Sequence, residues 1–500
     1  MDVASFWVET WSRLWEWLLA DWRLALFFMV DFIIRVIAII VVPRNRRPTA
    51  GMAWLLAIFL IPYFGVLAFL LIGNPKLPRY RRKIQDEINE FIRIAGENLP
   101  KQDLRPNPPA WFSSLVQLNR NLGALPLLGG NTAALLGDYN RTIDAMIDAI
   151  DNANRHVHVE FYILSCDQTT APFFDALERA VARGVSVRVL LDHVANMRTK
   201  GYGKTKRRLD AIGADWHLML PLQPWRGKFQ RPDLRNHRKV LVVDGLVAFM
   251  GSQNVIDRSY NKRGNIRRGL QWQELVARVE GPVVGGIQAI FFSDWYSETG
   301  ELLSGEIDLV DPDVEDGNLD CQVVPSGPGF DGENNLRLFL GLLYSAQKRI
   351  VITSPYFVPD ESMLYAITTA VHRGVPVDLF VSEMGDQALV YHAQRSYYEA
   401  LLRAGVRIYL YPAPYILHAK HFTIDDEVAV IGSSNMDMRS FGLNLEVSLM
   451  VRGESFVNDM RAVEDEYRLK SRELTLDEWM KQPLRSTVLD NLARLSSALQ

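Results

Sequence analysis

The chain of 500 residues is longer than one ordinary domain and suggests three or so units of about 150 residues each. A hydrophobic fraction of 48% and a charged fraction of 23% are globular averages, which exclude a disordered, collagen-like or coiled-coil protein. The formal net charge of −3 is not that of a dedicated nucleic-acid-binding protein, and two cysteines exclude a disulfide framework or a thiolate metal cluster. We expect Cys166 and Cys321 to be buried as small apolar side chains.

Five tryptophans lie close to the start of the chain, between residues 5 and 22. Trp7, Trp11 and Trp15 recur at every fourth position, so they would form one stripe on a helix. Indole rings gather at membrane–water interfaces, and the sequence therefore predicts an interfacial amphipathic helix over residues 1–23. A stripe packed against protein core is the alternative interpretation.

Two apolar segments follow, and both are long enough to cross a membrane. Residues 24–42 contain two charges, and residues 50–72 contain none. At about 1.5 Å per residue the first segment spans about 28 Å, which is close to the thickness of the hydrocarbon core. Because only a short turn separates the segments, the sequence predicts a two-helix transmembrane hairpin over residues 24–72.

The charges around this hairpin bear on its orientation. Asp31 and Arg35 lie on one face of the first helix and are expected to pair with each other rather than with an ion or a headgroup. The turn holds three arginines, whereas the flanks on the other side hold seven lysines and arginines. Positively charged flanks stay in the cytoplasm, so these counts predict a multi-pass protein of the inner, cytoplasmic membrane with both termini in the cytoplasm.

The rest of the chain repeats itself after a basic stretch and proline-rich linker at residues 73–110. AVARGVSVRVLLD at residues 180–192 corresponds to AVHRGVPVDLFVS at residues 370–382, and each comprises a helix end, a glycine and a strand. In both halves a strand precedes this segment, and a second helix–glycine–strand step follows it.

This alternation predicts an α/β fold with two tandem domains, over residues 111–308 and, with a C-terminal helix, residues 309–500. Each domain is expected to hold a mixed, largely parallel sheet flanked by helices. The amphipathic segment 484–499 is expected to pack on its own domain. A duplicated domain suggests a pseudo-twofold axis with one shared site between the halves.

Each half carries the same polar motif. HRKVLVVD at residues 237–244 is followed by GSQN at 251–254, and HAKHFTID at 418–425 is followed by GSSN at 432–435. A single His-x-Lys-x4-Asp pattern arises by chance in such a chain with odds on the order of a few in a hundred. Two copies with the same tail, in matching halves of a repeat, indicate a function.

The motif has a geometry that suits phosphoryl chemistry. Histidine and lysine two residues apart on a strand point to one face, while the aspartates fall in hairpin turns and the glycines allow close approach of strands. Two imidazoles, two amines and the amides can hold a phosphate oxyanion, with one imidazole attacking phosphorus and the other protonating the leaving oxygen. For one motif alone, a structural histidine and a solvated lysine would be the better interpretation. The other histidines are interpreted as structural, including His156 and His158, whose spacing could also hold a metal.

With these paired motifs the chain resembles the phospholipase D superfamily over residues 110–480, and its N-terminal hairpin is similar to that of the bacterial cardiolipin synthases in that superfamily. The resemblance implies a two-step phosphatidyl transfer with no metal and no other cofactor. It implies that His237 forms a phosphohistidine, and that His418 protonates the departing glycerol and then activates the incoming hydroxyl. Because the two motifs are nearly equivalent, the residues themselves leave open which histidine attacks.

The resemblance also assigns the remaining site residues. Glu274 and Glu446 match acidic residues that orient the histidine of the other half. We expect Glu446 to pair with His237, and Glu274 with the second histidine. The catalytic set is completed by Lys239, Lys420 and the motif aspartates Asp244 and Asp425, which would have a structural role. The expected phosphate-binding residues are Ser252, Asn254, Ser433 and Asn435.

The implied reaction converts two phosphatidylglycerols into cardiolipin and glycerol, so the expected partners are these membrane lipids and no nucleic acid. One alternative is hydrolysis, as in a phospholipase D-type phosphodiesterase or a nuclease with the same fold, because the motifs do not reveal whether water or a hydroxyl meets the intermediate. Another is a synthase that uses phosphatidylethanolamine as donor. A non-enzymatic membrane scaffold is disfavoured because both motifs are intact. The sequence indicates no particular oligomeric state.

Two basic runs could assist lipid binding. The run after the hairpin would attract anionic lipid at about 1 kcal/mol per charge, or would be an ordinary cytoplasmic flank. It consists of Lys76, Arg79, Arg81, Arg82 and Lys83. The second run precedes the first motif and is expected to extend the phosphate site, with a solvated loop as the alternative. It consists of Arg226, Lys228, Arg231 and Arg235.

Overall fold

The computed structural model describes residues 22–44, 46, 48–73, 76–97, 104–223, 230–303, 317–330 and 332–495. The chain forms two compact units, Met1–Pro75 and Lys76–Gln500. The predicted interfacial helix over residues 1–23 lies outside the described residues, apart from its last two positions.

The first unit contains the predicted membrane anchor. Helix α2 (Trp22–Val41) is the only helix of the described chain that is long and apolar enough to cross a membrane. Most of its large apolar side chains are exposed, as lipid contact requires. The guanidinium of Arg35 lies 2.9 Å from the carboxylate of Asp31, which confirms the internal ion pair predicted for this helix.

The prediction of one continuous helix over residues 50–72 is wrong. The segment forms α3 (Pro48–Leu60) and α4 (Pro62–Ile72), because Pro62 has no N–H and disfavours helical geometry at Ile61, whose φ and ψ are −135° and 75°. The chain then folds back on itself. A Cβ at Gly65 would lie only 2.7 Å from the carbonyl oxygen of Ala57, so only glycine allows this close contact between α3 and α4.

Further contacts bring the two ends of this broken segment together. The rings of Trp54 and Phe69 meet edge to face with centroids 5.5 Å apart. Arg46, just before α3, donates a hydrogen bond of 3.1 Å to the carbonyl oxygen of Gly73, just after α4, and its guanidinium lies over the Phe69 ring. The segment therefore begins and ends on the same side.

The second unit begins with a helix where the sequence predicted only a basic stretch and linker. This helix, α5 (Arg79–Glu97), packs on α12 (Val283–Thr299). Arg81 is buried and donates two hydrogen bonds of 2.8 Å to the carboxylate of Glu298. That arginine anchors the helix and is not available to attract lipid.

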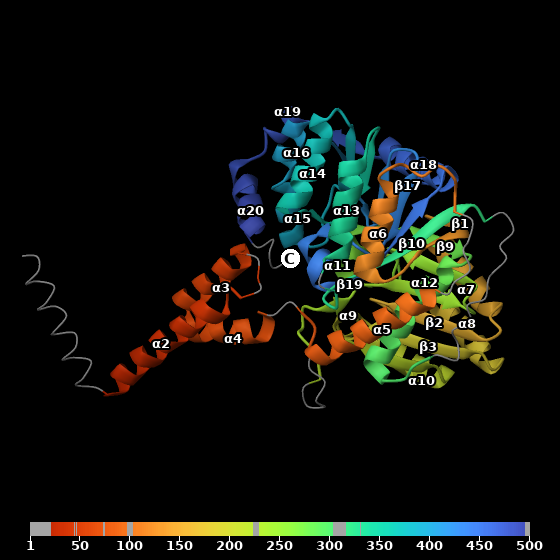
Figure 1. Ribbon diagram of the computed structural model, residues 1–500, viewed down its shortest axis with the longest axis horizontal. Coiled ribbons are helices and arrows are strands. Elements are labelled where there is room, and N and C mark those ends of the chain that lie inside the picture. Colours follow the sequence, from red (N-terminus) through yellow and green to blue (C-terminus); the bar gives the residue numbers. More distant parts are fainter. Residues whose placement is uncertain are drawn as a thin grey trace, which may run out of the picture. The chain divides into compact units, whose positions relative to one another are not determined.

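The remainder of the second unit is built on one continuous sheet (Figure 1). The strands of the first half are β1 (Leu127–Leu136), β2 (His156–Phe161), β3 (Ser186–Asp192), β4 (Asp215–Met219), β6 (Lys239–Val243), β7 (Val247–Gly251) and β9 (Val276–Glu280). Those of the second half are β10 (Leu319–Ser326), β11 (Ile350–Thr353), β13 (Val377–Ser382), β14 (Arg407–Tyr411), β16 (His421–Ile424), β17 (Val428–Gly432) and β19 (Asn444–Arg452). Short strands β5 (Arg235–Asn236) and β20 (Arg472–Leu474) join the same sheet.

The two halves have the same strand order, which is β9-β7-β6-β2-β3-β4 in the first and β19-β17-β16-β11-β13-β14 in the second. The prediction of a largely parallel sheet is wrong, because only the last three strands of each series are parallel. The hairpin that carries each motif adds antiparallel strands beside them. Strands β1 and β10 pair with each other at the centre and join the halves.

Helices cover both faces of this sheet. In the first half they are α7 (Tyr139–Asp151), α8 (Ala171–Ala182), α9 (His193–Arg198), α10 (Tyr202–Ile212), α11 (Arg263–Arg268) and α12. In the second they are α13 (Asn334–Ser345), α14 (Glu361–His372), α15 (Ala388–Arg395), α16 (Tyr398–Ala404), α17 (Met438–Gly442), α18 (Glu454–Lys470), α19 (Leu476–Trp479) and α20 (Leu484–Leu495), while α6 (Phe112–Gly123) packs on α13. One apolar core combines side chains of both halves, including Val242 of the first and Val447 of the second. The halves therefore fold against each other.

Several single-residue predictions can be compared with this core. Cys166 and Cys321 are buried and unbonded, as predicted. His156 and His158 stack with ring centroids 4.5 Å apart inside the fold, in agreement with a structural role. The C-terminal helix α20 packs on α15, where the carboxylate of Asp490 lies 2.6 Å from Nδ1 of His392.

The motif aspartates hold the strand ends of each half together. Asp244 has a φ of 54° in the β6–β7 turn, and its carboxylate accepts hydrogen bonds of 2.7–2.8 Å from three successive backbone N–H groups at residues 154–156. Asp425 has a φ of 49° in the β16–β17 turn and binds the backbone at residues 347–349 in the same way. Both carboxylates thus bind backbone N–H groups of their own half, which supports the structural role predicted from their turn positions.

We expect Asp244→Ala to lower the free energy of unfolding of the second unit by about 2–3 kcal/mol, because three backbone donors lose a charged acceptor. Thermal unfolding of the detergent-solubilised protein measures this change. Asp426→Ala, at the exposed neighbour of Asp425, is the control and should change the melting temperature little. A large loss of activity with an unchanged melting temperature would contradict the structural role.

Candidate active site

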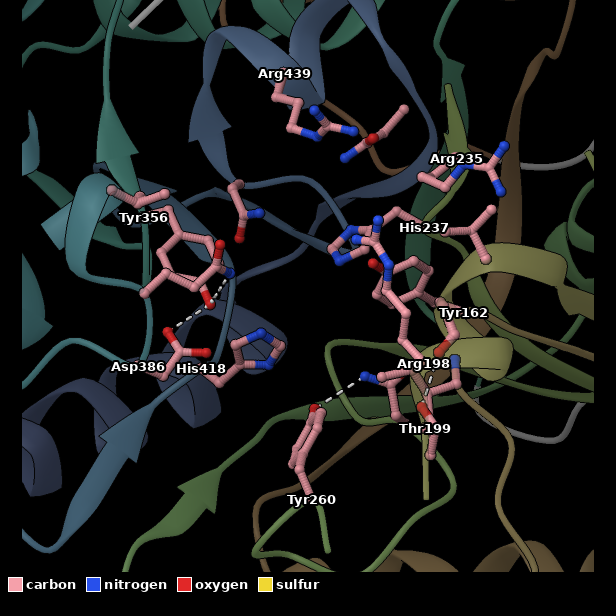
Figure 2. Close-up of a pocket in the computed structure, with 18 of the residues that line it drawn as sticks. Tyr162, Arg198, Thr199, Arg235, His237, Tyr260, Tyr356, Asp386, His418 and Arg439 are labelled. Carbon is pink, nitrogen blue, oxygen red and sulfur yellow. Dashed lines mark hydrogen bonds between the residues drawn. The ribbon is translucent and has the colours of Figure 1, made fainter. Parts of the chain in front are cut away.

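The two motif histidines meet in one pocket, and each is held by the opposite half. The backbone N–H of His237 donates to the carbonyl oxygen of Leu445 at 2.8 Å, and that of His418 donates to Gln273 at 2.7 Å. Both histidines line a pocket of about 1150 Å³ (Figure 2). Asn254 and Asn435 line the same pocket. The site therefore lies between the halves and includes residues of both.

A buried carboxylate from the other half fixes each imidazole. Nδ1 of His237 lies 3.0 Å from the carboxylate of Glu446 and 3.1 Å from the carbonyl oxygen of Ser433. Nδ1 of His418 lies 2.8 Å from the carboxylate of Glu274. Carboxylates and carbonyls only accept hydrogen bonds, so Nδ1 carries the proton in both rings. Each Nε2 then keeps a lone pair and can act as nucleophile or base.

Burial and the glutamates set the charges of these groups. Burial lowers the pKa of His237 to about 4, although Glu446 acts to raise it. Burial likewise lowers the pKa of His418. Burial alone would raise the pKa of Glu446, but the interactions of its carboxylate with His237, Lys239 and Ser433 together hold that pKa below its ordinary value. Neutral imidazoles beside ionised carboxylates are therefore the resting state at neutral pH.

The motif lysines lie beneath the histidines rather than on the pocket wall. The amine of Lys420 donates a hydrogen bond of 2.7 Å to the carbonyl oxygen of His418, and Lys239 bonds to the carbonyl oxygen of His237 in the same way. Burial lowers the pKa of Lys239 to about 7 and that of Lys420 to about 8. Their charges act on the pocket from behind the histidines without lining it, and an anion in the pocket would favour their protonated forms.

The serines and asparagines of the motif tails differ in what they contact. Ser433 donates its hydroxyl hydrogen bond to the carboxylate of Glu446, and the hydroxyl of Ser252 accepts from the N–H of Leu275, next to Glu274. The serines thus hold the segments that carry the glutamates and do not line the pocket. Of the two asparagines, Asn254 donates an amide hydrogen bond of 2.9 Å to the hydroxyl of Tyr260. The side-chain oxygen of Asn435 is buried and has no hydrogen-bond partner among the described residues, so it can accept from a ligand.

The basic run before the first motif contributes less than expected. Arg226 and Lys228 lie outside the described residues. Arg231 pairs with Asp233. Arg235 lines the pocket, but its guanidinium lies 3.3 Å from the carboxylate of Asp192, which offsets its charge.

Sequence reasoning missed several pocket residues. The ring of Tyr162 packs edge-on against His237 with centroids 4.8 Å apart, and Tyr356 packs against His418 at 6.3 Å. Each tyrosine follows the corresponding strand of its half, β2 or β11, so alignment of the two repeats could have found the pair. Three charged residues that also line the pocket, Arg198, Asp386 and Arg439, belong to no repeated motif.

Comparison with known proteins agrees with this geometry. The family model described as "Cardiolipin synthase, PLD-like domain" matches residues 146–283 and 339–466, once in each half, and a phospholipase D–nuclease N-terminal model matches residues 33–74. The chain belongs to the cardiolipin synthase family of phospholipase D-like proteins. It is 32% identical to cardiolipin synthase A of Proteus mirabilis over 91% of this chain and 94% of the relative, and equally similar to that of Serratia proteamaculans.

A solved structure shares the fold of the second unit. The phosphatidylserine synthase of Haemophilus influenzae aligns with a TM-score of 0.57 at 16% identity, over 77% of this chain and 99% of that structure. At this identity the likeness establishes the fold alone.

The shifted pKa values predict how activity depends on pH. The pKa of about 4 keeps His237 neutral, so activity should persist as the pH falls to about 5. Lys239 and Lys420 lose their charges as the pH rises through about 7 and 8, so anion binding should weaken and kcat/KM should fall on the alkaline side. Initial rates from about pH 5 to 9 test this; a profile that rises up to pH 9 would contradict it.

Proposed function

We propose that this protein is a cardiolipin synthase that transfers a phosphatidyl group from one phosphatidylglycerol to another and releases glycerol. Its membership of the family supports this function. The observation that carries it is the pair of imidazoles in one pocket, each with Nδ1–H on a buried glutamate and with no hydrogen bond at Nε2 from the described residues. Such a pair can supply a nucleophile and an acid to the same phosphate.

In the proposed first step, Nε2 of His237 attacks phosphorus and the bond from phosphorus to the glycerol oxygen breaks. A proton from His418 goes to that oxygen, and glycerol leaves. For this His418 must gain a proton, which the bound phosphate anion favours by raising the pKa of the imidazole. In the second step His418 takes the proton from a hydroxyl of the second phosphatidylglycerol, whose oxygen displaces His237 from phosphorus.

In this scheme the other predicted site residues act on the phosphate or on the histidines. Lys239 and Lys420 offset the charge of the phosphate from below, and Asn435 and Asn254 donate to its oxygens. Ser252, Ser433 and the two glutamates hold the imidazoles in place. Neither a metal nor another cofactor takes part.

Purified protein in proteoliposomes of phosphatidylglycerol should form cardiolipin and free glycerol in equal amounts, also with a chelator present. His237→Ala and His418→Ala should each lower the rate at least about a hundredfold, because each removes one of two groups that act in sequence. Mass spectrometry of the lipids measures the products. Phosphatidic acid as the main product would indicate hydrolysis, and cardiolipin formed only when phosphatidylethanolamine is added would indicate the other donor.

We also propose that the anchor holds the catalytic unit at the cytoplasmic face of the inner membrane, with one crossing by α2. A second crossing, as predicted from the sequence, would need α3 and α4 to form one straight helix. They contain 13 and 11 residues, or about 20 Å and 17 Å, each shorter than the hydrocarbon core of about 30 Å. The hydrogen bond between Arg46 and Gly73 supports a re-entrant pair that enters and leaves on one side.

The distribution of basic residues supports the single crossing. In the two-crossing arrangement the three arginines of the turn face away from the cytoplasm. With a re-entrant pair they join the basic residues that follow α4, and all eight lie on one side. The other side then holds only Arg13 and Arg23. This is the stronger asymmetry, and it supports a cytoplasmic location of the second unit.

The two arrangements differ in the location of the N-terminus. We expect a cysteine at Ala4→Cys to react with a membrane-impermeant maleimide in intact bacteria, whereas one at Gln500→Cys should react only after the inner membrane is permeabilised. The native cysteines are buried and give a low background. Protection of both positions in intact cells would support two crossings and contradict the re-entrant pair.

A further inference from the structure

The chain segments beyond β3 and β13 place side chains of opposite charge in the pocket, although the halves share one fold. In the first half the chain beyond β3 leads through α9 to Arg198, which lines the pocket with Lys200. In the second half the chain beyond the equivalent strand β13 leads to Asp386. Figure 2 shows Arg198 with Tyr162 on the side of His237, and Asp386 with Tyr356 on the side of His418. The repeat thus breaks its symmetry at these positions of the pocket.

One carboxylate oxygen of Asp386 accepts a hydrogen bond that holds the residue beside His418. The hydroxyl of Tyr356 donates a hydrogen bond of 2.8 Å to Oδ1 of Asp386, and the amide of Gln387 donates one of 3.0 Å to the Tyr356 hydroxyl. The Tyr356 ring in turn packs on His418. Within the described chain, Oδ2 of Asp386 has no hydrogen bond and no cation beside it, so it can accept from a ligand in the pocket.

We propose that Asp386, positioned by Tyr356, binds the glycerol headgroup of phosphatidylglycerol by accepting hydrogen bonds from its hydroxyls. This inference rests on the proposed function. A carboxylate accepts from a neutral diol but repels a phosphate, so the uncharged end of the headgroup lies beside Asp386. The anionic parts of the lipid lie toward Arg198, on the side of His237.

This subsite also distinguishes the two histidines. In an in-line displacement the leaving oxygen departs opposite the nucleophile and beside the acid. Glycerol held by Asp386 therefore leaves beside His418, which makes His418 the acid and His237 the nucleophile. In the second step the headgroup of the acceptor lipid occupies the same subsite, with its hydroxyl beside His418. The difference between the two loops thus indicates which histidine is the nucleophile, a question that the two equivalent motifs leave open.

The reverse reaction isolates this subsite, because free glycerol is then a substrate with its own KM. Cardiolipin in proteoliposomes is mixed with increasing concentrations of glycerol, and the formation of phosphatidylglycerol is measured. We expect Asp386→Leu to raise the KM for glycerol about tenfold or more, and Asp386→Asn, which keeps an acceptor oxygen, to raise it about threefold. Circular dichroism and elution volume establish that each variant is folded.

Two further variants distinguish a loss of glycerol binding from a general loss of activity. Arg198→Gln should raise the KM for cardiolipin and leave that for glycerol unchanged, because it acts on the anionic side. Glu399→Gln, in an exposed ion pair with Arg403, should change neither. An unchanged KM for glycerol in folded Asp386→Leu overturns the subsite, whether or not cardiolipin synthesis is intact.

Failure of the proposed function gives a different result. If the wild type hydrolyses phosphatidylglycerol and makes no cardiolipin, the synthase function is wrong. The same glycerol series then measures how the phosphatidyl group partitions between water and glycerol. A partition toward glycerol that Asp386→Leu abolishes would still support the subsite, and a partition that the variant leaves unchanged would overturn it.

Discussion

The site depends on two buried hydrogen bonds that cross between the halves of the fold. Glu446 of the second half binds His237 of the first, and Glu274 of the first half binds the second histidine. Both carboxylates are almost completely buried, and a buried charge is costly unless it is paired. Separated halves would each expose an unpaired glutamate and an unoriented imidazole. The same two hydrogen bonds therefore stabilise the interface between the halves and keep the proton of each imidazole on Nδ1.

The duplicated fold brings two equivalent histidines into one pocket, where both can act on the same phosphate. The same hairpin, aspartate turn and glycine bring a histidine to the axis in each half. At Gly432, for example, a Cβ would lie only 2.3 Å from the carbonyl oxygen of Val447, so the strand pairing requires glycine. Symmetry alone gives no direction to the reaction. Direction comes from the loops beyond β3 and β13, where Arg198 faces Asp386 across the pocket.

The predictions from the sequence succeed where the signal is local or repeated. The meeting of both motif histidines in one pocket and the turn positions of the aspartates follow from two matched motifs. The ion pair of Asp31 and Arg35 follows from helix spacing. The break in the second apolar segment was missed because hydropathy registers Pro62 and Gly65 as part of an apolar run, whereas their backbone geometry folds the run back on itself. A single charged residue in a loop, such as Asp386, belongs to no pattern. Only the three-dimensional arrangement brings it beside His418.

Locating the covalent intermediate tests the proposed mechanism most directly. The protein is mixed briefly with phosphatidylglycerol that carries a label in its phosphate, quenched at alkaline pH to preserve phosphohistidine, and digested for mass spectrometry. We predict labelled lipid on the peptide that contains His237 and none on the peptide that contains His418. Label on His418, or cardiolipin formation with no trapped intermediate at either histidine, would contradict the mechanism.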